Sequence, residues 1–297
     1  YNAISAILRG YGDSKRPMMF IALACVLNII GDVVLTGILG LGVAGVAIAS
    51  TASQCICAVL IIVSLLRSKE NIALRPHALK VSPDKACFVL RLGIPAGFQN
   101  AIFAIANLFI QSGVNSFDAV TVEGNSAAAN SDALVYDVMN AFYMACSSFI
   151  SQNMGAKKKK RMLQSYFISL AYSFGAGAVL GLSLVVFGRQ FLSLFTKDAA
   201  VMEAGMARLR VMGFSYMVSA FMDNTIAASR GLGKALVPTI IVILGSCVFR
   251  VVWVYTIFAY FHTIDSLYLL YVFSWTITAV AEILYFAKSY RKLAATL

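Results

Sequence analysis

Long apolar stretches separated by short polar connections dominate the chain. Eight such stretches lie at about 17–38, 41–66, 88–115, 126–153, 163–187, 205–229, 236–260 and 264–287. A helix of roughly 20 mostly apolar residues spans the hydrocarbon core of a bilayer. Small residues recur within the stretches, as helices that pack closely in lipid require. The pattern predicts an all-α polytopic membrane protein.

Composition supports the same conclusion. Of the 297 residues, 60% are hydrophobic and 12% are charged, and the mean hydropathy is +0.81. An average soluble domain carries about 25% charged residues. A soluble fold of this chain would expose large apolar patches. We therefore expect the chain to be embedded in a lipid bilayer.

The net charge of +11 is distributed unevenly along the chain. Lys and Arg occur in every second connection, at 9–16, 67–91, 157–161 and 230–234, and again after residue 287. Connections rich in Lys and Arg remain in the cytoplasm. We therefore predict a multi-pass protein of the inner cell membrane, with its basic loops and C-terminus cytoplasmic. The exception is the connection around Arg189 and Lys197, which Arg208 and Arg210 follow.

The same charges argue against nucleic-acid binding. No basic patch is interleaved with aromatic residues that could stack on bases, as nucleic-acid modules require. The basic balance is interpreted as a topology signal, with a weaker attraction to anionic lipid.

A short motif recurs at a fixed distance. RGYG at Arg9–Gly12 is followed by RGLG at Arg230–Gly233, and Pro17 and Pro238 each follow the Arg by eight residues. All these pairs differ by 221 positions, and a common register indicates an internal repeat. Glycines allow a tight turn between two helices, whose basic residues we expect at the headgroups. Six stretches separate the copies, so the two halves are predicted to be parallel.

A 221-residue period implies twelve helices in two six-helix halves. We expect residues 1–68 to end the N-terminal lobe, with the end of its fourth helix and all of its fifth and sixth. Residues 69–87 are then a cytoplasmic linker, and residues 88–297 form the six-helix C-terminal lobe. On this interpretation eight helices are complete, and the chain is an N-terminally truncated transporter.

Several ordered segments carry a family resemblance. They are LRGYGDSKRPM at 8–18, LNIIGDVV at 27–34, LGVAGVAIASTASQ at 41–54, LRLGIPAGFQN at 90–100, SQNMGAK at 151–157 and the run from Met222 to Pro238. Together they resemble the multidrug and toxic compound extrusion (MATE) family, and within it the bacterial DinF-like branch.

The resemblance implies a secondary active multidrug exporter, not an enzyme, that works by alternating access. Antiport against protons or sodium ions would drive export of small amphipathic, cationic compounds. We expect the protein to be a monomer and to need no cofactor besides the coupling ion. Its expected partners are the substrate and membrane lipid.

Asp32 is the leading candidate for ion coupling. A charged residue at a helix centre costs about 2.5–3.5 kcal/mol on insertion scales, so it needs a partner or a wet cavity. Asn28 lies four residues earlier, on the same helix face. Asn28 and Asp32 match the amide–acid pair that binds cations in the family, and Ser50 matches its hydroxyl ligand. A transported sodium ion at Asp32 is the only metal expected. The alternative is that Asp32 caps an early helix end.

Polar residues of later stretches are candidates for the substrate cavity. They are Asn107, Gln111, Asn130, Asp132, Tyr136, Asn140 and Asp223. The alternative is hydrogen bonding between helices, which polar residues in membrane helices commonly make. Asp223 could equally pair with Arg250, which we interpret as structural.

Two other functional classes fit the sequence less well than export. A lipid-linked substrate or polysaccharide flippase shares the superfamily fold but would show a strongly basic cavity. Arg250 is the one intramembrane cation that we expect, which disfavours this alternative. A membrane-embedded enzyme is disfavoured because no HExxH motif or nucleophile elbow is present.

Overall fold

The apolar stretches fold into helices in the computed structural model, which describes residues 1–68 and 72–296. The described residues are helices and connecting turns, without strands. The chain divides into two compact units, Tyr1–Ser82 and Pro83–Leu297. Residues 69–71 of the expected linker lie outside the described part. Each unit is considered by itself.

The first unit is built around a hairpin of two helices. Its elements are α1 (Asn2–Tyr11), α2 (Lys15–Asp32) continued by the π-helical η1 (Val33–Ile38), α3 (Gly42–Leu66) and the 3-10 turn η2 (Pro76–Ala78). Helices α2 and α3 approach closely at Gly31, where an added Cβ would lie 2.8 Å from the Cβ of Ala49. Small residues allow such contacts between helices in lipid.

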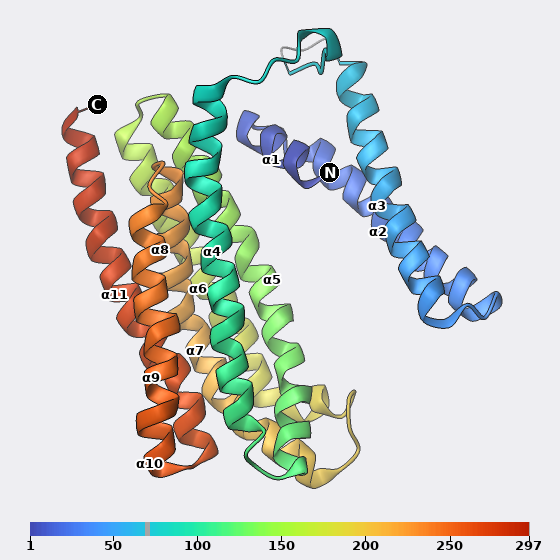
Figure 1. Cartoon of the computed structure of the whole chain (residues 1–297), viewed down its shortest axis with the longest axis vertical. Helices are drawn as coiled ribbons and strands as arrows, with labels where there is room; N and C mark the ends of the chain where they lie inside the picture. The colour runs from blue at the N-terminus through green and yellow to red at the C-terminus, as the bar shows by residue number, and fades with distance from the viewer. Residues whose placement is uncertain (69–71, 297) are drawn as a thin grey trace. The chain divides into compact units, whose positions relative to one another are not determined.

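The second unit is a bundle arranged around α7 (Figure 1). Its elements are α4 (Pro83–Val114), α5 (Ala119–Gly155), α6 (Lys159–Leu192), α7 (Ala199–Gly231), the continuous series α8 (Leu236–Val242), η3 (Ile243–Val248), α9 (Phe249–Trp253), η4 (Val254–Phe258) and α10 (Ala259–Phe261), and α11 (Ile264–Thr296). Helix α7 packs against α5, α6 and α11. Helix α4 begins at Pro83, five residues before the apolar stretch expected at 88.

Acidic side chains cap two of these helices. The carboxylate of Asp118 accepts from the backbone N–H of Thr121 at 3.2 Å, at the start of α5. Hydrogen bonding with Thr121 lowers the pKa of Asp118 below its ordinary value. Asp198 accepts from the N–H of Ala200 at 2.8 Å at the start of α7. Such caps satisfy amide groups that a helix leaves unpaired at its N-terminus.

Among the described residues, seven helical segments are long and apolar enough to cross a membrane. The eighth expected stretch, 205–229, corresponds to α7, which is 33 residues long but carries many polar side chains. Those side chains are tolerated because α7 is surrounded by other helices and faces protein rather than lipid. The prediction of an all-α polytopic membrane protein is confirmed.

The internal repeat is visible in the backbone. Gly12 and Gly233, which occupy equivalent places in the two motifs, both adopt left-handed φ values, +103° and +71°. Glycine enters this region without the penalty that a Cβ imposes. The π-helical segments η1 and η4 begin at Val33 and Val254, in the same register. The 221-residue period therefore relates the two turns and this pair of π-helical segments, whereas η3 has no counterpart, because the equivalent residues 22–27 lie within α2.

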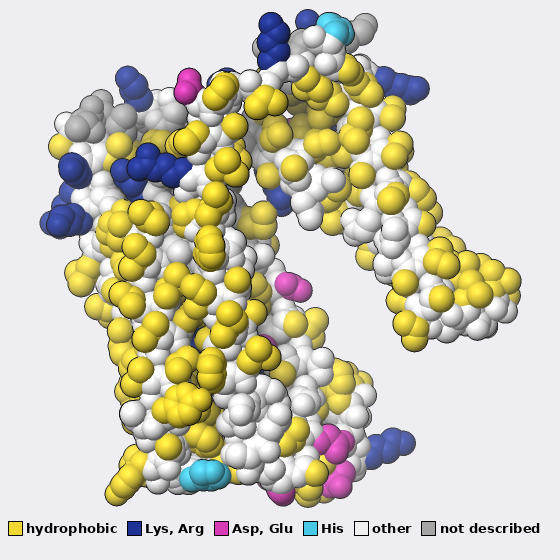
Figure 2. Space-filling model, in the orientation of Figure 1, with side chains coloured by type: hydrophobic (Ala, Val, Ile, Leu, Met, Phe, Trp, Pro, Cys, Tyr) yellow, Lys and Arg dark blue, Asp and Glu magenta, His cyan; other side chains and the backbone are white. Residues whose placement is uncertain are grey.

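Charged side chains of the second unit separate toward its ends (Figure 2). Lys and Arg side chains gather at the end where α11 terminates, and Asp and Glu side chains gather at the opposite end. Hydrophobic side chains cover the face between them. This arrangement is typical of a bundle whose middle lies in hydrocarbon.

Candidate functional site

A cavity of about 630 Å³ opens within the second unit, between α4, α5, α7, α9 and α11. This size is typical of cavities that hold small molecules. Its polar lining comprises Gln99, Asn100, Asn107, Gln111, Asn125, Asp132, Tyr136, Arg208, Tyr216, Ser219, Asp223 and Arg250. Phe103, Tyr271 and Trp275 add aromatic rings. The cavity therefore combines an aromatic wall with two acids and two arginines.

Five of the seven candidate cavity residues line this space. They are Asn107, Gln111, Asp132, Tyr136 and Asp223. Asn130 does not line it, and its amide donates to the backbone oxygen of Ser126 at 3.1 Å within its own helix. Asn140 is also outside the lining. Successive residues of a helix are rotated by about 100°, so residues close in sequence on α5 face different neighbours.

An ion pair crosses the cavity from α7 to α5. Arg208 donates to the carboxylate of Asp132 and, at 2.8 Å, to Oδ1 of Asn125. Tyr216 donates its hydroxyl to the other oxygen of Asp132, and Tyr268 donates to Asn125 at 3.2 Å. Arg208 is 5% exposed. The charges of Arg208 and Asp132 thus compensate each other in one network, in which Arg208 is buried and Asp132 is partly exposed.

Arg208 is a site residue that was not predicted from the sequence, because it was grouped with the basic residues near the start of the stretch 205–229. Helix α7 begins at Ala199, so Arg208 lies roughly 13 Å inside it. The available signal was that this connection broke the alternation of basic and non-basic loops. Asn125, its partner on α5, carried no signal of its own.

Arg250 has no such compensation. Its Nε donates to Ser274 Oγ and its Nη1 to Asn107 Oδ1, both at 3.3 Å. Its Nη2 is buried and makes no hydrogen bond, and in the described residues it forms no ion pair with Asp223 or any other acid. The sequence interpretation left pairing of Asp223 with Arg250 open, and the structure instead places both on the cavity wall without contact.

A second polar cluster lies at the end of α7. Arg230 donates to Oε1 of Gln99 at 2.9 Å, and Thr239 donates to the same oxygen at 3.3 Å. Arg230 was expected at the headgroups, but it is turned inward to α4. Glu282 on α11 is fully buried, and neither of its carboxyl oxygens has a hydrogen-bond partner.

The first unit brings together two of the three predicted coupling residues. The amide of Asn28 donates to Ser50 Oγ at 3.2 Å. Both residues border a hollow of about 200 Å³ with Ser53 and Gln54. Asp32 lies one helical turn beyond Asn28, and its Oδ1 is buried without a hydrogen bond. This carboxylate therefore has unused capacity for a proton or a cation.

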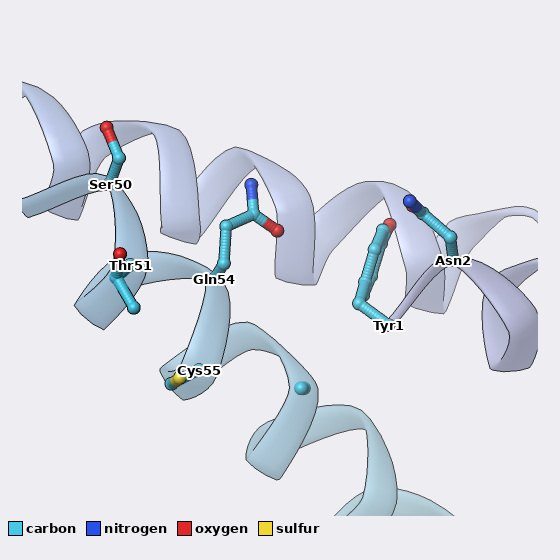
Figure 3. Close-up of a pocket in the computed structure, with 7 residues that line it drawn as sticks. Tyr1, Asn2, Ser50, Thr51, Gln54 and Cys55 are labelled. Carbon is cyan, nitrogen blue, oxygen red and sulfur yellow. The ribbon is translucent and has the colours of Figure 1, made fainter. Parts of the chain in front are cut away.

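A larger pocket of about 500 Å³ adjoins Ser50 on α3 (Figure 3). Ser50, Thr51 and Gln54 of α3 lie beside Tyr1 and Asn2 at the start of α1. Within residues 1–68 and 72–296, no group of three or more His, Cys, Asp or Glu is placed to hold a metal ion.

Comparison with known proteins reveals related transporters. The multidrug resistance protein YpnP of Bacillus subtilis, described as probable, is 28% identical over 246 residues, which cover 81% of this chain and 54% of YpnP. An FAD transporter of Shewanella oneidensis is 27% identical over 205 residues, which cover 66% of this chain and 44% of that protein. The chain spans about half the length of the curated relatives it matches.

The fold has close counterparts among solved structures. An outward-facing multidrug resistance MATE family transporter of the MOP superfamily superimposes with a TM-score of 0.88 at 22% identity, covering 97% of this chain and 65% of that one. A sequence model of the MatE family matches residues 95–256, which is more than half of the chain. The resemblance to the MATE family is thereby confirmed, while the DinF-like branch stays a prediction: this chain belongs to the MatE family of efflux transporters.

Proposed function

We propose that the chain forms part of a secondary active exporter of small amphipathic compounds, driven by the inward flow of protons or sodium ions. The observation that carries the proposal is the cavity within the second unit, where charged side chains and aromatic rings line space for a small molecule. Membership of a transporter family supports it. Alternating access would open such a cavity to each side of the membrane in turn.

The flippase alternative is less well supported. A cavity for lipid-linked phosphates would carry a clear excess of positive charge. Here Arg208 joins Arg250 on the wall, so the expectation of a single intramembrane cation was wrong. Nevertheless Asp132 neutralises Arg208 at contact distance, and Asp223 adds a second acid to the wall.

Ion coupling is proposed at Asn28, Asp32 and Ser50. The Asn28–Ser50 hydrogen bond leaves the amide oxygen of Asn28 free to act as a cation ligand, and the buried Oδ1 of Asp32 lacks a donor. A hard cation prefers such oxygen ligands, and a proton on the carboxyl group would equally satisfy the site.

Substrate contact is proposed for Asn107, Gln111, Asp132, Tyr136 and Asp223, which line the cavity. Asp223 is the acid best placed to face a cationic group, because it makes no ion pair in the described residues. The end of the second unit that is rich in Lys and Arg (Figure 2) is proposed to face the cytoplasm.

Asp32→Asn is expected to abolish driven export in the full-length transporter. The amide keeps the size of the side chain but neither releases a proton nor supplies an anionic ligand. Efflux of an amphipathic dye, measured from cells with imposed proton or sodium gradients, should fall to the background of non-expressing cells. Protein abundance in the membrane should remain unchanged.

Glu123→Gln provides the control for this experiment. It makes the same acid-to-amide change at an exposed position near the start of α5, and efflux should be unaffected. Gradient-driven efflux that persists in Asp32→Asn would refute coupling at this residue.

A further inference from the structure

We propose that Arg250 forms an oxyanion subsite in the cavity of the second unit, suited to a carboxylate or phosphate group carried on an aromatic body. The inference deepens the proposed function, on which it rests for its biological meaning, because it names a class of compound that the cavity would accept. It adds anionic amphiphiles to the cationic ones expected from the family resemblance.

The hydrogen bonds of Arg250 leave much of its guanidinium unused. A guanidinium has five N–H donors and no acceptor. In the structure two neutral oxygens accept from it, one on Ser274 and one on Asn107, each at 3.3 Å. Nη2 is shut off from water and has no acceptor. A buried cation with such sparse compensation is costly, so an additional partner is expected.

Arg208 in the same cavity supplies an internal comparison. Both arginines are almost fully buried, at 5% exposed for Arg208 and 2% for Arg250. Arg208 has a carboxylate partner in Asp132 and a short bond to Asn125. Arg250 has two long bonds and no carboxylate. The protein therefore provides an anion for Arg208 and none for Arg250.

Aromatic rings around Arg250 suit the body of such a ligand. The guanidinium carbon lies 4.8 Å from the ring centre of Tyr271, 5.1 Å from that of Phe103 and 5.9 Å from that of Trp275. These rings hold the cation by cation–π contact without neutralising it. All three also line the cavity, where a flat apolar group could pack against them.

The guanidinium fork faces a polar group that could assist binding. Nη1 contacts Asn107, which itself lines the cavity. Nη1 and Nη2 form one planar fork that matches the two oxygens of a carboxylate or phosphate. An oxyanion that displaced the Asn107 side chain from Nη1 would open a path to Nη2, which is closed to water in this structure, and would free the Asn107 amide to contact the ligand.

The other charged residues of the cavity wall determine how strongly the subsite at Arg250 prefers an anion. Asp132 is occupied by Arg208 and Tyr216. Asp223 carries the remaining negative charge, makes no ion pair in the described residues and acts on Arg250 through space. Asp223 therefore weakens, without cancelling, the attraction of Arg250 for an anion.

The test compares ligands with one body and different heads. Biphenyl-4-carboxylate, biphenyl-4-yl phosphate, biphenyl-4-methanol and biphenyl-4-methylammonium are titrated by calorimetry into the full-length protein in lipid nanodiscs. The carboxylate or the phosphate should bind at least ten-fold more tightly than the alcohol, and the tighter of the two identifies the preferred oxyanion. Equal affinity for all four, tighter binding of the ammonium compound than of both oxyanions, or no oxyanion binding at millimolar concentration would overturn the proposal.

Variants assign the preference to Arg250. Arg250→Gln should remove the oxyanion preference, and Arg250→Lys should retain part of it, because the charge remains while the fork is lost. Arg210→Gln removes an exposed arginine of α7 and should leave all four affinities unchanged. Asp223→Asn should tighten oxyanion binding, and weaker binding would contradict the proposal even if Arg250→Gln fails to fold.

The calorimetry is independent of transport. Loss of driven efflux in Asp32→Asn tests ion coupling and says nothing about the head group that the cavity prefers. An oxyanion preference without driven efflux would overturn the export function alone, and driven efflux without that preference would overturn the subsite alone.

Discussion

Gly181→Ala is expected to disrupt the second unit more than any other single methyl addition. A Cβ at Gly181 on α6 would lie 2.1 Å from the backbone oxygen of Gly213 on α7. A backbone atom has no rotamer to escape into, so the two helices must move apart. Overpacking typically costs 1–3 kcal/mol and occasionally more, and we expect about 3 kcal/mol here. Helix α7 packs on three other helices, so the shift would spread through the bundle.

Thermal melting of the purified protein checks this expectation. The midpoint, followed by the loss of the monodisperse peak on size exclusion, should fall by roughly 6–12 °C. Gly175→Ala is the matched control on the same helix, because a Cβ there would meet nothing within 4 Å. It should be neutral or slightly stabilising, since alanine favours helix over glycine. Equal midpoints for the two variants would show that α6 and α7 are not in contact at Gly181.

Asp132→Ala is expected to produce the second large loss of stability. The substitution leaves Arg208 buried without its carboxylate and removes the acceptor of the Tyr216 hydroxyl. Removing one partner of a buried pair costs about 3–5 kcal/mol, mostly because the other charge remains uncompensated. Asn125 and the rings of Tyr268 and Tyr271 remain beside Arg208, but none of them carries a negative charge.

Two controls test whether the loss of stability comes from the uncompensated buried charge of Arg208 or from the loss of any ion pair. Glu203→Ala removes a carboxylate that binds Arg189 at 2.7 Å and Arg210 at 3.1 Å at the exposed start of α7. The melting temperature should not change measurably, because exposed pairs contribute little. Combining Asp132→Leu with Arg208→Met should recover most of the stability. A double variant as unstable as Asp132→Ala would contradict this explanation.

The membrane-spanning architecture was predictable from the sequence because lipid imposes a simple requirement. Each spanning helix needs a long apolar surface, and a contiguous segment of the sequence supplies it. Helix α7 shows where the rule weakens. It is enclosed by α5, α6 and α11, so its side chains meet protein. The sequence predicted the stretch 205–229 as a span, but α7 is not among the seven segments that are long and apolar enough to cross a membrane.

The repeat was also predictable, because it rests on local backbone chemistry. A turn that requires a left-handed residue favours glycine, although Lys157 and His262 also adopt left-handed φ values in this chain. Gly12 and Gly233 therefore carry the register directly in the sequence. The π-helical segments that share this register could not be predicted, since neither η1 nor η4 has a distinctive residue pattern.

The candidate coupling residues show how much of a site can be predicted from sequence spacing along one helix. Asn28 and Asp32 share a helix face because they are four residues apart. Ser50 was assigned by family resemblance, and the packing of α2 on α3 places it 3.2 Å from Asn28.

The sequence alone thus determined the fold class, the number and order of most spans, the repeat and the helix faces on which polar residues lie. Only the tertiary structure decided which of those faces meet. Arg208 joins Asp132 across 76 positions, whereas Arg250 contacts Asn107 across 143 and no acid in the described part of the chain. The physical reason is that side-chain contact between helices depends on how each helix is rotated and shifted in the bundle. Those variables are set by packing throughout the unit, including close approaches such as Gly181 on Gly213.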